Sequence, residues 1–182
     1  PVIIMASVMN RRKIPLPQEP HYCNRGVHYC ELCDGHTYQD KVISGMCGGN
    51  AAVDAANFLT KYAKHLYLIH RSQLRANKSS QDALYANPKV TVMLETEITH
   101  LNGEDRLTSV DLLHKDTGAK ETLPVDAIFV NIGVIPNTEL FKGQLALTEA
   151  GYIPAGEDCR TEIPGVFAAG DIRVKEIHQL TT

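Results

Sequence analysis

The most reactive pattern in this sequence is a pair of cysteines separated by two residues. Cys30 and Cys33 are spaced to close a small disulfide, and the carboxylate of Asp34 follows the second sulfur directly. The thiolate is the reactive form of cysteine, and a C-x-x-C arrangement can lower the pKa of one thiol. A neighbouring carboxylate can carry a proton to or from that sulfur. The three residues therefore form a candidate catalytic redox centre.

The cysteine pair also has the spacing of zinc ligands, and further potential ligands lie nearby at His21, Cys23, His28 and His36. A zinc knuckle normally combines one C-x-x-C with a second one or with a spaced histidine pair, and the sequence has neither. The five cysteines are odd in number and irregularly spaced, which argues against a secreted disulfide scaffold. Redox chemistry is favoured and no metal site is predicted, while a non-catalytic zinc module stays open as an alternative.

A glycine-rich turn of the dinucleotide-binding kind follows the cysteine pair. The fingerprint G-x-G-x-x-G/A lets the backbone approach a pyrophosphate that rests on the N-terminus of a helix. Gly49 and Ala52 match its second and third positions, whereas Cys47 stands at the first and is expected to crowd the turn. A plain strand-to-helix turn is the simpler alternative. The candidate cofactor-binding residues here are Gly48, Gly49, Asn50, Ala51 and Asp54.

Basic residues at the end of the next expected strand select the cofactor. An acidic residue at this place binds the ribose of NAD, whereas a basic cluster accommodates the 2′-phosphate of NADP. The sequence has His70, Arg71 and, one turn later, Arg75, with no acid among them. Arginine is suited to bidentate contact with phosphate. NADP(H) is therefore the predicted cofactor, and a solvated basic loop is the alternative.

These residues require a β-turn-α-β unit to position them. We expect strands at 1–7, 41–46, 66–69, 90–94, 107–114, 120–123, 128–133 and 166–171, with helices at 50–63 and 74–86. Asn50 is expected to cap the first helix. Pro15, Pro17 and Pro20 predict a connector without regular structure over 10–22. The expected class is α/β, with a Rossmann-like βαβ domain built from a parallel sheet plus a β-hairpin or meander.

Composition narrows the functional classes. The chain has 182 residues, 43% of them hydrophobic and 21% charged, and a net charge of −3. These values are typical of a soluble globular protein and give no reason to expect nucleic acid or an anionic membrane as a partner. No apolar run approaches the roughly 18 residues that span a bilayer, and no secretory signal is recognisable. A cytoplasmic protein is expected, and the start within an apolar run predicts a fragment.

Taken together, the motifs resemble the low-molecular-weight thioredoxin reductases, which are flavin- and NADPH-dependent pyridine nucleotide-disulfide oxidoreductases. Residues 26–35 resemble the redox-disulfide segment of that family, and residues 48–54 resemble its NADPH turn. His70, Arg71 and Arg75 resemble its 2′-phosphate cluster. Residues 133–138 and 166–171 resemble its G-x-x-P-N-T and A-A-G-D signatures. The resemblance covers nearly the whole chain, in order.

The resemblance implies a mechanism. NADPH reduces FAD, FAD reduces a Cys30–Cys33 disulfide, and one thiolate then attacks the disulfide of thioredoxin while Asp34 serves the proton transfers. It also implies a homodimer, with hinges at 10–22 and 133–138. The further cofactor-binding residues that it implies are Ile132, Gly133, Gly170, Asp171, His178, Gln179 and Leu180.

The resemblance divides the chain into three parts. Residues 1–15 are expected to be a remnant of the first segment of an FAD-binding domain with its linker, residues 16–134 the NADP-binding domain, and residues 135–182 a partial second FAD-domain segment. Because the N-terminal flavin half of the family has no counterpart here, FAD is expected in the full-length protein and this fragment is expected to be inactive alone. A related dithiol oxidase that uses oxygen and a diverged flavin-free NADP-binding protein stay open.

Overall fold

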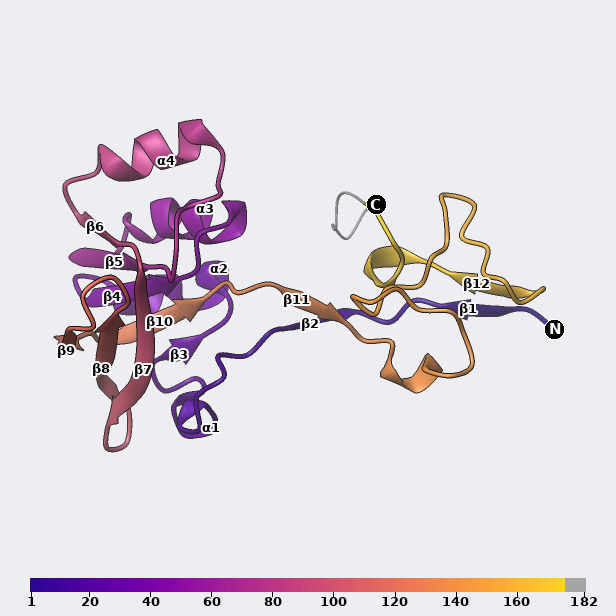
Figure 1. Ribbon diagram of the computed structural model, residues 1–182, viewed down its shortest axis with the longest axis horizontal. Helices are drawn as coiled ribbons and strands as arrows, with labels where there is room; N and C mark the ends of the chain where they lie inside the picture. The colour runs from indigo at the N-terminus through magenta and orange to yellow at the C-terminus, as the bar shows by residue number, and fades with distance from the viewer. Residues whose placement is uncertain (176–182) are drawn as a thin grey trace. The chain divides into compact units, whose positions relative to one another are not determined.

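The computed structural model describes residues 1–175, which form two compact units (Figure 1). Residues 13–132 form a central unit, and residues 1–12 together with residues 133–175 form a smaller one. The chain therefore leaves the small unit once and returns to it once. Within the described part, no helix is long and apolar enough to cross a membrane.

The central unit is built on a five-stranded parallel sheet. Its strand order is β3 (Val27–His28), β10 (Ala127–Val130), β4 (Val42–Met46), β5 (His65–Ile69) and β6 (Val90–Met93). Every residue of β10 is buried, as expected for a strand that has a neighbour on each side in a sheet covered on both faces. The predicted α/β class with a parallel sheet is confirmed.

Two helices cover one face of this sheet. They are α3 (Asn50–Leu59), which follows β4, and α4 (Lys78–Tyr85), which follows β5 (Figure 1). Phe129 points to this face and packs with Val53, Leu59 and Leu84 in one hydrophobic cluster. Burial of such large side chains contributes roughly 1.5–3 kcal/mol each, which holds the helices on the sheet.

An antiparallel meander covers the other face. It consists of β7 (Thr96–Gly103), β8 (Leu107–His114) and β9 (Lys120–Pro124). Ile128 and Val130, which alternate with Phe129 along β10, pack here against Val110 and Leu112. The two sequence-predicted strands of the hairpin region are present, and β7 is an additional strand that the sequence pattern did not reveal.

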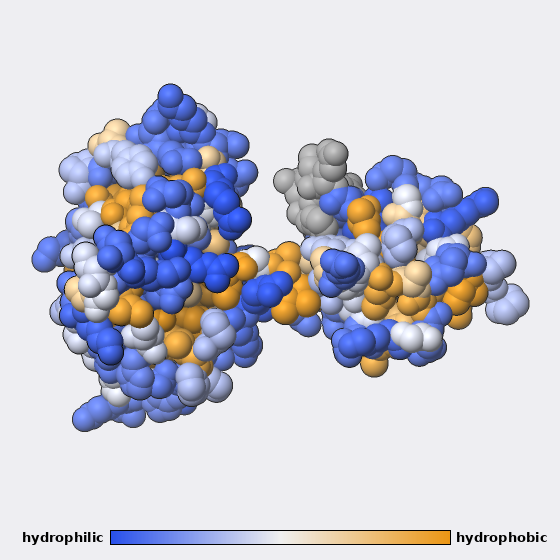
Figure 2. Space-filling model, in the orientation of Figure 1, coloured by the Kyte–Doolittle hydropathy of each residue, from blue (hydrophilic) through white to orange (hydrophobic). Residues whose placement is uncertain are grey.

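The small unit holds two short strand pairs. β1 (Ile3–Met5) pairs in parallel with β12 (Val166–Ala168), and β2 (Met9–Arg11) pairs antiparallel with β11 (Val134–Pro136). The short 3-10 turns η2 (Glu139–Phe141) and η3 (Gly170–Ile172) complete it. Its small core contains Met5, Ile153, Ala155, Ala168 and Ile172. Hydrophobic side chains also reach the surface of this unit (Figure 2), among them Val2, Ile4, Val8 and Leu140.

Two predictions about local structure were wrong. The segment 10–22 is not wholly irregular, because it contains the end of β2 and the short helix α1 (Glu19–Tyr22). Pro20 lies in the first turn of α1, where a helix needs no backbone N–H donor. Asn50 does not cap α3, because Gly49 occupies the N-cap position in an extended conformation.

Candidate functional site

Cys30 and Cys33 form a disulfide, with their Cα atoms 5.3 Å apart. Cys30 follows β3 and occupies the N-cap of the short helix α2 (Glu31–Asp34), so the turn of α2 brings Cys33 back to it. The backbone N–H of Cys33 donates to Cys30 Sγ at 3.2 Å. Cys33 is exposed and Cys30 is half-buried. The predicted pair is thus joined at the surface, where an external disulfide can reach it.

Neighbouring side chains fix the helix that carries the disulfide. Asn131, just after β10, donates to the carboxylate of Glu31 at 3.4 Å. Gly35 ends α2 against the side chain of Leu59 on α3, where a Cβ would meet that side chain at 2.7 Å. Leu32, between the cysteines, is 69% exposed. The segment that carries the disulfide is therefore held by contacts with Asn131 and α3. On its exposed side it presents the apolar side chain of Leu32 to solvent.

Asp34 contacts a buried histidine that sequence reasoning treated only as a potential zinc ligand. The carboxylate Oδ2 of Asp34 lies 3.2 Å from Nδ1 of His28. Nε2 of His28 lies 2.7 Å from the hydroxyl of Tyr38. Burial lowers the pKa of His28, and the charge of Asp34 opposes that shift. Nothing in the sequence pattern signals this cluster, because α2 and the turn after it must form before the three side chains meet.

The glycine-rich turn connects β4 to α3 and is packed against the next strand. A Cβ at Gly48 would lie 2.5 Å from the ring of His70. A Cβ at Gly49 would meet nothing within 4 Å, so the backbone there is open at the N-terminus of a ten-residue helix. Cys47 has a φ of 124°, in the region that favours glycine. The crowding expected from the side chain of Cys47 stays a prediction.

The three basic residues lie on the loop after β5, beside this turn. His70 is buried, whereas Arg71 and Arg75 are exposed. The backbone N–H of Arg75 donates to the carbonyl of Gly48 at 2.7 Å, which ties the loop to the glycine-rich turn. Burial lowers the pKa of His70, and the charges of Arg75 and Arg71 lower it further. The structure therefore brings the predicted turn and the predicted basic cluster together.

Two predicted cofactor residues of α3 contact α4. Asn50 Oδ1 accepts from the backbone N–H of Asn77 at 2.7 Å, and Asp54 Oδ1 accepts from the hydroxyl of Ser80 at 2.9 Å. Ala51, in the first turn of α3, is exposed. The side chains of Asn50 and Asp54 thus hold the two helices together beside the turn.

The remaining predicted residues lie at or beyond the end of the central unit. Ile132 packs partly buried against the meander side of the sheet, and Gly133 has a φ of 102°. In the small unit, Gly170 has a φ of 73° with open space around it, and Asp171 pairs with Lys175 at 2.9 Å. His178, Gln179 and Leu180 lie outside the described residues.

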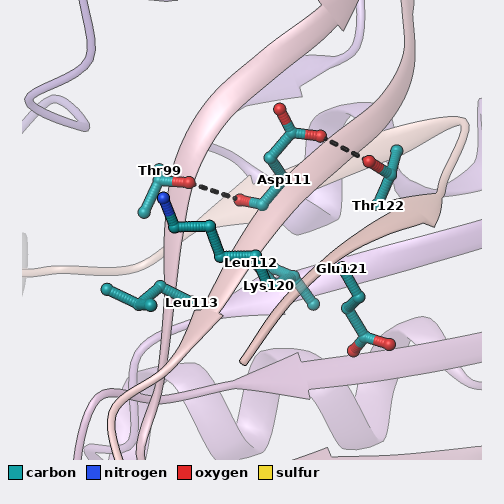
Figure 3. Close-up of a pocket in the computed structure, with 7 residues that line it drawn as sticks. All are labelled: Thr99, Asp111, Leu112, Leu113, Lys120, Glu121 and Thr122. Carbon is teal, nitrogen blue, oxygen red and sulfur yellow. Dashed lines mark hydrogen bonds between the residues drawn. The ribbon is translucent and has the colours of Figure 1, made fainter. Parts of the chain in front are cut away.

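A hollow on the meander lies apart from all these residues (Figure 3). It is lined by Thr99, Asp111, Leu112, Leu113, Lys120, Glu121 and Thr122. Thr122 and Asn102 donate to the Asp111 carboxylate and lower the pKa of this group. These hydrogen bonds satisfy the carboxylate within the sheet, and we assign no chemistry to the hollow.

The zinc alternative finds no support in the part of the chain that the structure describes. Residues 1–175 contain no group of three or more histidine, cysteine, aspartate or glutamate side chains placed to hold a metal ion. The cysteines with zinc-like spacing are joined to each other instead.

Comparison with known proteins places these features in a family. The family model described as pyridine nucleotide-disulphide oxidoreductase matches residues 2–182. The chain belongs to this family. Among curated proteins, the chain is 42% identical over 181 residues to the "34.2 kDa protein in rubredoxin operon" of Clostridium pasteurianum. It is 39% identical over 172 residues to a thioredoxin reductase of Streptomyces clavuligerus. These matches cover 99% and 93% of the chain.

Solved structures agree with this assignment. The crystal structure of Lactococcus lactis thioredoxin reductase matches all of the chain with a TM-score of 0.90 and 33% identity, and the chain covers 60% of it. The chain spans 59% and 53% of the two curated relatives. The chain is therefore thioredoxin reductase-like in sequence and fold, and it corresponds to somewhat more than half of its relatives' length.

Proposed function

We propose that this chain supplies the dithiol and the NADP-binding part of an NADPH- and FAD-dependent disulfide reductase. In this proposal, electrons pass through Cys30 and Cys33 to thioredoxin or a similar dithiol protein. The observation that carries the proposal is a surface disulfide in the same compact unit as an open glycine-rich turn with two exposed arginines beside it. The names of the relatives support the choice of thioredoxin as partner.

The central unit fits NADPH. Gly49 leaves room for the pyrophosphate at the N-terminus of α3, where the backbone N–H groups and the helix dipole favour an anion. Arg71 and Arg75 are exposed beside the turn and would hold the 2′-phosphate. On this reading the central unit, residues 13–132, is the NADP-binding domain that sequence analysis expected over 16–134.

The small unit fits one edge of FAD. Gly170 leaves its backbone open, and Asp171 beside it offers a carboxylate for hydroxyl groups, although this carboxylate is paired with Lys175 here. We therefore assign the small unit to the FAD-binding domain and expect the complete protein to supply the other contacts. Bound FAD would carry electrons from NADPH to the disulfide. A cytoplasmic homodimer is proposed from the family resemblance alone.

The chemistry of the dithiol follows from two exchange steps. Asp34 takes the proton of one thiol of the reduced pair, and the resulting thiolate attacks a sulfur of the partner disulfide. A mixed disulfide forms, the partner's S–S bond breaks, and the departing partner sulfur receives that proton to leave as a thiol. The second thiol then gives up its proton and attacks the mixed disulfide, the Cys30–Cys33 bond forms again, and the second partner sulfur takes up a proton, so that the partner departs as a dithiol. Two electrons have passed to the partner, and the exposure of Cys33 makes the first attack accessible.

The decisive test uses the complete protein loaded with FAD. We expect NADPH-dependent reduction of thioredoxin, followed through the release of a coloured thiol from a reporter disulfide, and a loss of at least 100-fold in Cys30→Ser, because no disulfide can form without Cys30. Oxygen consumption without NADPH binding would instead favour a dithiol oxidase. NADPH binding without bound flavin would favour a flavin-free NADP-binding protein.

A further inference from the structure

One buried titratable side chain beside the disulfide has no part in the electron path proposed above. His28 is 6% exposed and lies in β3, two residues before Cys30. Burying an imidazole costs free energy unless its two ring nitrogens find hydrogen-bond partners. The partners of His28 therefore indicate what the residue does.

The two ring nitrogens of His28 face two different side chains. Nδ1 lies 3.2 Å from Oδ2 of Asp34, within ion-pair distance, and among the described residues this buried nitrogen has no hydrogen-bond partner in place. Nε2 lies 2.7 Å from the hydroxyl of Tyr38. Three side chains thus form a row that begins with the carboxylate next to Cys33 and ends in the interior.

The ring has little freedom to turn. It stacks on Phe129 of the central strand β10 with the ring centroids 5.5 Å apart and an interplanar angle of 26°. The ring of Tyr38 meets it edge-on at 5.2 Å and packs edge-on against Phe129 as well. Because both neighbours are buried, the direction of the Nδ1–Asp34 contact is set by the core of the central unit.

The partners also define the proton positions. An ionised carboxylate only accepts hydrogen bonds, so Nδ1 can use the 3.2 Å approach to Asp34 only if it carries the proton. Nε2 of a neutral ring then accepts from the hydroxyl of Tyr38. Burial lowers the pKa of His28, which favours the neutral ring, and the charge of Asp34 opposes this shift. The charged and titratable groups that influence His28 and Tyr38 are Asp34, Arg106 and Asp126.

We propose that His28 is a positioning residue that donates its Nδ1–H to Asp34, with Tyr38 fixing the tautomer, and so holds that carboxylate in place for proton exchange with the Cys30–Cys33 dithiol. The proposal deepens the proposed function, because it concerns the same dithiol. It does not depend on NADPH or FAD, and its test therefore uses neither.

The first experiment reads the tautomer directly. In the 182-residue chain labelled with ¹⁵N histidine, the ring nitrogens of His28 are expected to show a protonated Nδ1 and an unprotonated Nε2 at pH 7.5. Tyr38→Phe removes one oxygen from the interior and is expected to weaken this preference. A wild-type ring protonated at Nε2 would overturn the proposal, since Nδ1 would then have no proton to donate to an ionised Asp34.

The second experiment measures the exchange reaction of the reduced chain with glutathione disulfide. One protein thiolate displaces a glutathione thiolate, the second closes the Cys30–Cys33 bond, and two glutathione thiols are released. We expect His28→Leu and Asp34→Asn each to slow this reaction by about 10-fold, which is part of the effect of a positioned acid or base. The double variant should be no slower than Asp34→Asn alone, because His28 acts through Asp34.

The conservative variant separates positioning from structural damage. His28→Asn places an amide N–H near the position of Nδ1 and should recover most of the exchange rate, whereas His28→Leu cannot. Alkylation of Cys159, which lies in the small unit, serves as the internal control and should not change. If His28→Leu slows the exchange as much in the Asp34→Asn background as it does in the wild type, the two effects are independent. That result would show that His28 does not act through Asp34 and would overturn the proposal.

Discussion

Gly48 faces the ring of His70 so closely that a Cβ at this position would lie 2.5 Å from it. At the next residue, Gly49, an added Cβ would meet no atom within 4 Å. Two adjacent glycines of one turn therefore have different reasons to lack a side chain. Gly48 is needed for packing within the protein, and Gly49 leaves space that we assign to the cofactor.

This difference predicts opposite outcomes for two alanine variants. Gly48→Ala should lower the free energy of unfolding by about 1–3 kcal/mol, because the buried His70 ring must move. Gly49→Ala, at a φ of −84°, should leave the stability within about 0.5 kcal/mol of the wild type but weaken NADPH binding by about 10-fold or more. Urea unfolding and titration of NADPH into the 182-residue chain provide the two readouts. Equal NADPH affinity in Gly49→Ala and the wild type would show that the pyrophosphate does not bind at this turn.

The two exposed arginines of the β5–α4 loop predict selectivity for NADPH over NADH. Arg71→Ala and Arg75→Ala should each raise the dissociation constant of NADPH by about 10-fold, equivalent to about 1.4 kcal/mol, and leave that of NADH nearly unchanged. Arg160→Ala in the small unit is the matched control, since Arg160 is also exposed. Parallel losses for NADPH and NADH would show that the arginines do not contact the 2′-phosphate.

The loop also contains an available position for a third basic side chain. Ser72 is exposed directly after Arg71, and its hydroxyl lies 3.3 Å from Nε2 of His70. Ser72→Arg should therefore lower the dissociation constant of NADPH by about 3- to 10-fold, because a further guanidinium would stand beside the 2′-phosphate. Ser72→Gln, of similar length but uncharged, is the control. The same titration decides, and an identical gain in both variants would point to packing rather than charge.

The backbone at Cys47 predicts a stabilising substitution. A non-glycine residue at a φ of 124° is strained by roughly 1–3 kcal/mol. Cys47→Gly should recover about 1 kcal/mol of this in the free energy of unfolding, after the loss of the Cβ is counted. Cys47→Ala keeps the Cβ and should recover none of it. Urea unfolding of the two variants checks the prediction, and equal stabilities would show that the thiol itself, rather than the backbone, decides the stability at this position.

The two buried histidines predict that acid destabilises the central unit. Burial lowers the pKa of His28 and of His70 below the ordinary value of 6.5, so the unfolded chain binds these protons first. The free energy of unfolding should therefore fall as the pH drops below 6.5, by at most about 1.4 kcal/mol per pH unit for each histidine, until the folded state is protonated too. Hydrogen exchange of the β10 amides between pH 7.5 and 5 measures the change. His28→Asn should show a smaller dependence, and an unchanged slope would exclude His28 as a contributor.

The sequence predicted the part of the fold in which local patterns agree with the final packing. Strand β4, the turn at Gly49 and helix α3 could be recognised because an apolar run, a glycine signal and helical spacing follow one another. Strand β7 was hidden, because register shifts between Ile98 and His100 and between Asn102 and Gly103 interrupt the alternation of buried and exposed residues. Helix α1 was missed because Pro20 lies in its first turn, and the sequence alone does not distinguish such a proline from one that prevents a helix.

The candidate site was predictable to a similar extent. The cysteine pair and the basic loop carry their chemistry in their spacing, and the structure joins the first as a disulfide and ties the second to the glycine-rich turn. The row from Asp34 through His28 to Tyr38 was not predictable, because these contacts exist only once α2 and the turn after it bring the three side chains together. Likewise, the roles of Asn50 and Asp54 in joining two helices depend on where α4 packs.

The backbone N–H of Arg12 donates to the carbonyl of Gly133 at 2.9 Å, at the place where the chain leaves the small unit and later returns to it. The two ends of the intervening 13–132 segment therefore start from neighbouring points. We therefore expect that the segment 13–132 could be removed and its flanks rejoined through a short linker, because the two flanks already meet at this hydrogen bond. The redox pair and the glycine-rich turn would leave together in such a removal.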